Sequence, residues 1–139
     1  MNEQISRGID LKELWQITIL EDLEKKVVEW ANAKGIMNKS NSKYQLSKTI
    51  EECGEILQAL LAYDQYAHSD SIYDDPDRES KLNELESDLR SEYGDAIVTL
   101  IIGMALSGMS LTECLSSAYN KISKRSGKMI NGQFVKDAA

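Results

Sequence analysis

The sequence has few of the residues that interrupt helices or build disulfide frameworks. It contains one proline and two cysteines among 139 residues, and few runs of β-branched residues. This composition favours helices, because proline is the strongest helix breaker. Cys53 and Cys114 do not form a CxxC motif, and two cysteines do not make a disulfide framework. We therefore expect both to be buried free thiols in a reducing compartment.

The chain also lacks a basic tract and a long apolar run. Its net charge of −7 disfavours non-specific binding to nucleic acid or to an anionic membrane. The longest apolar run, residues 96–106, is about half of the ~20 residues that a membrane span needs. The N-terminal segment has no apolar signal region. These absences predict a soluble cytoplasmic protein, and the length predicts a single domain.

Apolar residues recur at helical spacing and predict an all-α fold, a four-helix bundle. Asp10 and Glu13 form a capping-box pattern that opens a short helix in an N-terminal extension, 1–19. The domain itself is expected at 20–136, with an acidic loop at 67–80 and a tail at 137–139. Ser110 and Glu113 form a second capping-box pattern, and a turn is expected at Asn131-Gly132. The predicted main helices cover about 20–34, 44–66, 81–107 and 111–125, with a loop at 36–43.

Acidic residues interrupt two of these apolar patterns. Glu51, Glu52 and Glu55 lie in the second main helix, and Glu92 and Asp95 lie in the third. Residues three apart on a helix point the same way, so Glu52 pairs with Glu55 and Glu92 with Asp95. Small residues follow both pairs along the same face, which allows the two helices to approach closely. We expect the two pairs to face each other.

Four ionised carboxylates brought together repel one another strongly, and a divalent cation removes that conflict. Ligation by oxygen alone suits hard ions such as Mg²⁺ or Mn²⁺. A ferritin-like di-iron site needs two Glu-x-x-His motifs, and the only histidine, His68, lies outside both acidic motifs. The acids of the 67–80 loop lack the pattern of a calcium loop and are expected to be solvated.

Glu51-Glu52-x-x-Glu55 followed by Glu92-x-x-Asp95 resembles the EExxE…ExxD signature of the MazG-type all-α nucleoside triphosphate pyrophosphatases. The resemblance includes Lys48 before the first motif and the closing segment 118–125. It covers residues 20–136 and is greatest to the short single-domain members of phages and bacteria. The separation of the two motifs is longer than in many members, and the 67–80 loop accounts for it as an insertion.

The resemblance implies hydrolysis of nucleoside triphosphates or deoxynucleoside triphosphates to the monophosphate and pyrophosphate, which controls or cleanses the nucleotide pool. It implies that Glu52, Glu55, Glu92 and Asp95 bind Mg²⁺, with Mn²⁺ as a substitute. Glu51 would contact a further metal ion or orient the attacking water, or it is a plain surface acid. The resemblance also implies a homodimer or a dimer of dimers.

Lys121 and Arg125 match the phosphate-contacting pair of this family, although the helix dipole alone also favours cations at that place. Lys48 either pairs with Glu52, the reading we prefer, or reaches a phosphate. Trp30 would stack on a nucleobase or pack in the core. Asn120 is a candidate for reading the base or sugar, and the preferred base stays open.

Two alternatives remain open from the sequence. One is a non-catalytic helical dimer that binds a nucleotide or a protein partner. The other is a dUTPase-like activity on a related fold, which would use a diphosphate directly.

Overall fold

The structure, a computed structural model, describes residues 11–138, with side chains from residue 19 onward except that of Ser71. It is mostly helical, as the all-α prediction requires. The expected capping box at Asp10 and Glu13 lies outside the described residues and side chains. The described elements, in chain order, are α1 (Leu11–Ala33), α2 (Ile36–Lys39), α3 (Ser42–Ala67), η1 (Asp70–Asp74), α4 (Arg78–Leu106), α5 (Leu111–Ile122), β1 (Gly127–Ile130) and β2 (Gln133–Lys136).

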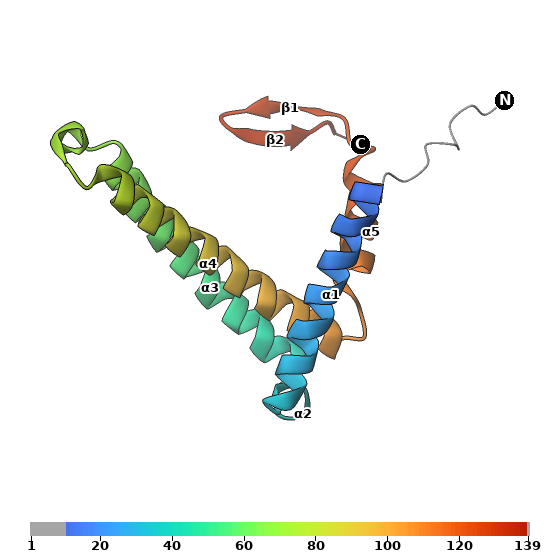
Figure 1. Ribbon diagram of the computed structural model, residues 1–139. Helices are drawn as coiled ribbons and strands as arrows, with labels where there is room; N and C mark the ends of the chain where they lie inside the picture. The colour runs from blue at the N-terminus through green and yellow to red at the C-terminus, as the bar shows by residue number, and fades with distance from the viewer. Residues whose placement is uncertain (1–10, 139) are drawn as a thin grey trace.

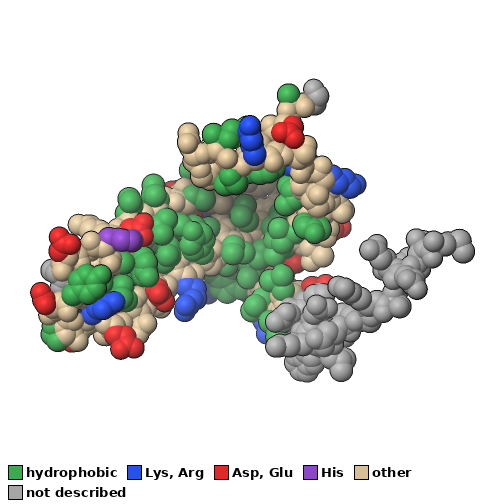
Figure 2. Space-filling model, turned by 90° about the horizontal axis from the view of Figure 1, so that it is seen from above, with side chains coloured by type: hydrophobic (Ala, Val, Ile, Leu, Met, Phe, Trp, Pro, Cys, Tyr) green, Lys and Arg blue, Asp and Glu red, His purple; other side chains and the backbone are tan. Residues whose placement is uncertain are grey.

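The chain has the shape of a V (Figure 1). One arm is the antiparallel hairpin of α3 and α4, which pack along their length. The other arm consists of α1, α5 and the β1–β2 hairpin, and α1 crosses α4 near the vertex. Ala31 of α1 is fully buried at this crossing region. In the single chain the helices therefore form a hairpin and an arm, and the inside of the V is lined largely by hydrophobic side chains (Figure 2).

Small and polar side chains hold α3 against α4. The hydroxyls of Thr49 and Thr99 are 2.8 Å apart, and Thr49 is buried. A Cβ added to Gly103 would lie 3.5 Å from the Cβ of Gln45, so little space separates the backbones there. Ala96 is also buried. On α4 the contact therefore uses the predicted small residues Ala96, Thr99 and Gly103, whereas on α3 it uses Gln45 and Thr49.

Several helix boundaries differ from those predicted. Residues 36–43, predicted as a loop, contain the one-turn helix α2, which follows Gly35 at a positive φ of 76°. α3 begins at Ser42 because the Asn41 side chain accepts hydrogen bonds from the backbone N–H groups of Lys43 and Tyr44. α1 runs unbroken from Leu11 to Ala33, so the short helix expected before residue 20 and the first main helix are one helix.

The C-terminal part confirms one predicted cap and corrects one helix end. Ser110 and Glu113 form the expected capping box, with the Ser110 N–H donating to the Glu113 carboxylate over 2.8 Å. α5 ends at Ile122, so Arg125 lies beyond the helix and not in its last turn. The Asn131-Gly132 turn is confirmed and joins β1 to β2, both residues having positive φ.

Burial within the described chain is sparse. The buried hydrophobic residues are Ala31, Ile72, Ala96, Ile101 and Ile102. Cys53 is exposed and Cys114 only partly covered, so the prediction of two buried thiols is wrong for Cys53 in the single chain. No single helix in the described range is long and apolar enough to cross a membrane, although α4 and α5, bent by 98°, meet the length and composition criteria as a pair.

The predicted acidic loop at 67–80 is an ordered clasp at the tip of the hairpin. The Asp75 carboxylate accepts hydrogen bonds from the Lys81 ammonium at 2.6 Å, the Tyr66 hydroxyl at 2.8 Å and the Asp77 N–H at 2.9 Å. These donors, Lys81 first, lower the pKa of Asp75 to about 2. Ile72 of η1 is buried. Through Asp75, these hydrogen bonds connect Tyr66 at the end of α3 to Lys81 at the start of α4.

We expect an Asp75→Asn chain to be less stable than the wild type at neutral pH. Because the pKa of Asp75 is lower in the folded chain than its usual value near 3.9, the contribution of its carboxylate is present above that value and is lost as the pH falls toward 2. Urea unfolding followed by circular dichroism at pH 7 and at pH 2.5 would measure it. The difference in the free energy of unfolding between the wild type and Asp75→Asn should be smaller at pH 2.5 than at pH 7. Asp74→Asn changes the exposed neighbouring position and is the control, which should not show this pH dependence.

Candidate metal centre

Three of the four predicted metal ligands come together at the α3–α4 contact. Glu52 and Glu55 come from α3 and Glu92 comes from α4. One carboxylate oxygen from each lies within 4.8 Å of the others. Glu52 and Glu92 are partly buried, whereas Glu55 is exposed. Two motifs that are distant in the sequence thus form one cluster, open to solvent on one flank.

The spacing of these oxygens fits a small divalent cation. Ligands of one Mg²⁺ at about 2.1 Å are roughly 3 Å apart when adjacent and roughly 4.2 Å apart when opposite. Oxygens within 4.8 Å of one another reach such a geometry by small side-chain rotations. Carboxylate oxygens are hard donors, and no cysteine or histidine belongs to the group. The donors Glu52, Glu55 and Glu92 therefore fit Mg²⁺ or Mn²⁺.

Lys48 lies at the edge of this cluster. Its ammonium is 2.5 Å from a Glu51 carboxylate oxygen and 3.8 Å from one of Glu52. The hydrogen bond to Glu51, followed by the charges of Glu51, Glu52 and Glu55, raises the pKa of Lys48. Lys48 therefore stays protonated and partly neutralises the cluster. The preferred expectation, that Lys48 pairs with Glu52, is confirmed at 3.8 Å. Glu51 is nevertheless the closer partner of Lys48.

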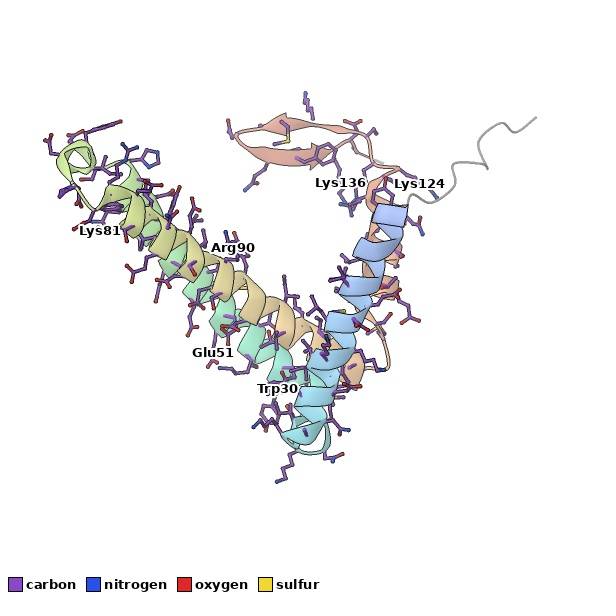
Figure 3. All side chains as sticks on the ribbon, in the orientation of Figure 1. Trp30, Glu51, Lys81, Arg90, Lys124 and Lys136 are labelled. Carbon is purple, nitrogen blue, oxygen red and sulfur yellow. The ribbon has the colours of Figure 1, made fainter. Side chains whose placement is uncertain are left out.

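Asp95 and Glu51 complete the two sequence motifs at the margin of the cluster. Asp95 is exposed and is not one of the three converging residues, although it lies one turn beyond Glu92 on the same helix. Glu51 is exposed and forms an ion pair with Lys48. Figure 3 shows Glu51 on the hairpin arm of the V. These two acids extend the negative flank without joining its centre.

The remaining predicted site residues do not lie at the cluster in this chain. Lys121 and Asn120 belong to α5, and Arg125 follows it, all in the other arm of the V. Trp30 lies near the end of α1, and 49% of its surface is exposed, so it is not a core residue of the single chain (Figure 3). The structure thus separates the proposed phosphate-binding cations from the acids.

The contact between Thr49 and Thr99 is a feature of the site that sequence reasoning missed. Thr49 lies one turn before Glu52, and Thr99 two turns after Glu92, on the sides where α3 and α4 meet. Their hydroxyls also contact the carbonyls of their own helices, at Gln45 and Ala96. The available signal was a small polar residue on the acidic face of each helix, one turn before Glu52 on α3 and one turn after Asp95 on α4.

Comparison of the chain with models of protein families, with curated proteins and with solved structures finds no match to any of the three.

We expect Mg²⁺ or Mn²⁺ to stabilise the wild-type chain more than a Glu92→Gln chain at the same metal concentration. Without metal, the variant should be at least as stable as the wild type, because one of three mutually repelling charges is gone. With metal, the wild type should gain stability in proportion to the logarithm of metal concentration. Thermal unfolding over a metal titration, with calorimetry for affinity, would measure both effects.

The loss of one ligand should weaken metal binding about tenfold or more. Glu86→Gln is the matched control, since Glu86 is on the same helix and lies outside the converging group. A Glu92→Gln chain that binds Mn²⁺ as tightly as the wild type would remove Glu92 from the ligand set.

Proposed function

We propose that this chain is a Mg²⁺-dependent nucleoside triphosphate pyrophosphohydrolase of the MazG type, which cleaves between the α and β phosphates. The observation that supports it is the convergence of Glu52, Glu55 and Glu92, from two separate motifs, within 4.8 Å. A triphosphate carries several negative charges and would not approach such a flank unless a cation joined them. Carboxylates that hold Mg²⁺ convert a repulsive flank into a binding surface for phosphate.

The roles of the residues follow from their positions. Glu52 and Glu92 are partly buried and have limited freedom to rotate, so they fix the centre of the site. Glu55 is exposed and supplies the side open to substrate. Asp95 adds a carboxylate one turn beyond Glu92. In this proposal, these four residues are the metal ligands.

Bound Mg²⁺ would neutralise the phosphates and lower the pKa of a coordinated water. The chain then needs no covalent nucleophile, because phosphoryl transfer depends mainly on positioning and charge stabilisation. Lys48 holds the Glu51 carboxylate at 2.5 Å. In that position Glu51 is suited to accept a hydrogen bond from the attacking water and to orient it.

Incubation of the wild type with a panel of nucleoside and deoxynucleoside triphosphates plus Mg²⁺ should release the monophosphate and pyrophosphate. Glu52→Gln should lower turnover at least ~100-fold, because the amide keeps the shape and loses the charge that binds the ion. Anion-exchange chromatography of the products measures both. Asp64→Asn, on the same helix two turns beyond Glu55, is the control and should retain activity.

The products separate this proposal from its alternatives. Direct use of a deoxynucleoside diphosphate, which would release one phosphate per monophosphate formed, would support dUTPase-like chemistry instead. Single phosphates released from a triphosphate that is not first cut to the monophosphate would point to a different reaction. Binding of a nucleotide without turnover at any Mg²⁺ or Mn²⁺ concentration would support the non-catalytic reading. Full activity of Glu52→Gln would contradict the ligand assignment.

A further inference from the structure

Two pairs of hydroxyl groups join α3 to α4 on one side of the three carboxylates. The hydroxyl oxygens of Thr49 and Thr99 are 2.8 Å apart. Those of Ser42 and Ser107 are also 2.8 Å apart, about two helical turns away on both helices. The threonine pair is the one beside the carboxylates, because Thr49 precedes Glu52 by one turn.

The geometry requires that one of the two threonines donates its proton to the other. The Thr49 hydroxyl oxygen lies 3.0 Å from the carbonyl oxygen of Gln45. The Thr99 hydroxyl oxygen lies 2.8 Å from the carbonyl oxygen of Ala96. Each hydroxyl has a single proton, so if both protons pointed at these carbonyls, lone pairs would face each other across 2.8 Å. One proton therefore lies between the threonines, and their contact is a hydrogen bond between the two helices.

Burial distinguishes this hydrogen bond from the serine pair. Thr49 is only 7% exposed, whereas Ser107 is exposed to solvent. Water competes for an exposed hydroxyl group, so the contact between Ser42 and Ser107 adds little to the attachment of the helices. A buried hydrogen bond is stronger, because water is excluded from it. The threonine pair is therefore the firmer of the two connections.

The carboxylates lie nearer to the threonine pair than to the connections on their other side. One helical turn, about 5.4 Å along the axis, separates Thr49 from Glu52. Toward the tip of the hairpin, the exposed Tyr63 hydroxyl donates to Glu86 over 3.5 Å, about two turns beyond Glu55. The clasp lies farther still. The distance between α3 and α4 at the carboxylates is thus controlled most closely by the threonines.

This distance matters because the ligands come from both helices. Glu52 and Glu55 belong to α3 and Glu92 belongs to α4, so their repulsion acts to separate the helices. Mg²⁺ needs oxygens at about 2.0–2.1 Å in near-octahedral geometry, whereas Ca²⁺ accepts about 2.3–2.6 Å and irregular geometry. Selectivity between these ions depends on the size and the flexibility of the site. The separation of α3 and α4 therefore determines which ion fits better.

We propose that the hydrogen bond between Thr49 and Thr99 positions the metal ligands, by holding α3 and α4 at the separation that Mg²⁺ requires. The threonines act through Glu52 and Glu92, the partly buried ligands of the two helices. Loss of the hydrogen bond lets the helices move apart, which weakens Mg²⁺ binding and favours the larger Ca²⁺. This inference rests on the metal ligands of the proposed function, and metal binding tests it without any turnover.

A Thr49→Val chain tests the hydrogen bond directly. Valine keeps the shape of the side chain and removes its hydroxyl, and Thr99 then donates to the Ala96 carbonyl, so no donor is left unsatisfied. The affinity for Mg²⁺ should fall about tenfold, and the affinity for Ca²⁺ should fall less. Electron paramagnetic resonance of bound Mn²⁺, displaced by Mg²⁺ or by Ca²⁺, measures both affinities.

Thr49→Ser and Ser107→Ala are the matched controls. Serine keeps a hydroxyl at position 49 and should restore most of the affinity for Mg²⁺ and the ratio of the two affinities. Ser107→Ala removes the exposed pair and should change neither affinity by more than about twofold. Circular dichroism confirms that each variant remains helical.

Thr99→Val removes the same hydrogen bond from the other helix and gives a second test of it. Its affinities should match those of Thr49→Val, and the double variant should bind Mg²⁺ no more weakly than either single variant. Losses that multiply in the double variant would show that the two hydroxyls act separately, which contradicts the proposal. If Thr49→Val loses its helical structure, Thr99→Val supplies the comparison with the wild type.

The remaining outcomes also decide the matter. A helical Thr49→Val chain that binds Mg²⁺ as tightly as the wild type overturns the proposal, and so does a Thr49→Ser chain that binds it as weakly as Thr49→Val. Equal losses for Mg²⁺ and Ca²⁺ overturn the role of helix separation. A wild type that binds Mg²⁺ and cleaves no triphosphate refutes the proposed function alone, since the affinities still test the threonines. A wild type that binds neither ion overturns both.

Discussion

The approach of α3 to α4 is the constraint on which the rest of the structure depends. Three carboxylates meet where these helices touch, and their mutual repulsion pushes the helices apart. Small side chains and the hydroxyl contact between Thr49 and Thr99 oppose that push. Lys48 lowers the local charge at one edge. The helices are thus held close by short polar contacts, at the place where close approach is electrostatically costly.

The hairpin divides its surface between two kinds of interaction. One flank carries Glu52, Glu55 and Glu92 and is suited to ions, whereas the opposite flank carries exposed leucines and isoleucines. Neither flank packs against the body of its own chain to any large extent. A protein of this size usually buries both sides of such a hairpin in a single core. Here the two helices instead act as a partition between a hydrated side and an apolar side.

The sequence predicted the helical class and the pairing of the acids well, because both depend on local periodicity. Spacing of three residues places Glu52 with Glu55 whatever the tertiary structure, and small residues allowed α3 to meet α4. The capping box at Ser110 was predicted for the same reason. What failed was burial. Cys53 was expected to be buried and is exposed in the single chain, because an apolar stripe looks the same whether its own chain or another molecule covers it.

Two further limits have physical causes. α5 ends at Ile122, before Arg125, and the chain then turns into the β1–β2 hairpin; apolar periodicity alone did not place this end. The position of α5 relative to the acids depends on how α1 crosses α4, and that crossing is set by contacts between distant residues. A motif match can assign Lys121 and the acids to one site. Only the path of the chain decides whether they lie close together within one molecule.

The order of the elements along the chain has a consequence for biosynthesis. α3 and α4 are neighbours in sequence, so their contacts are of low contact order and form quickly. Translation completes them before the basic residues of 121–138 are made, and domains fold from the N-terminal side as they emerge. The negatively charged ridge therefore leaves the ribosome ahead of the basic residues of 121–138.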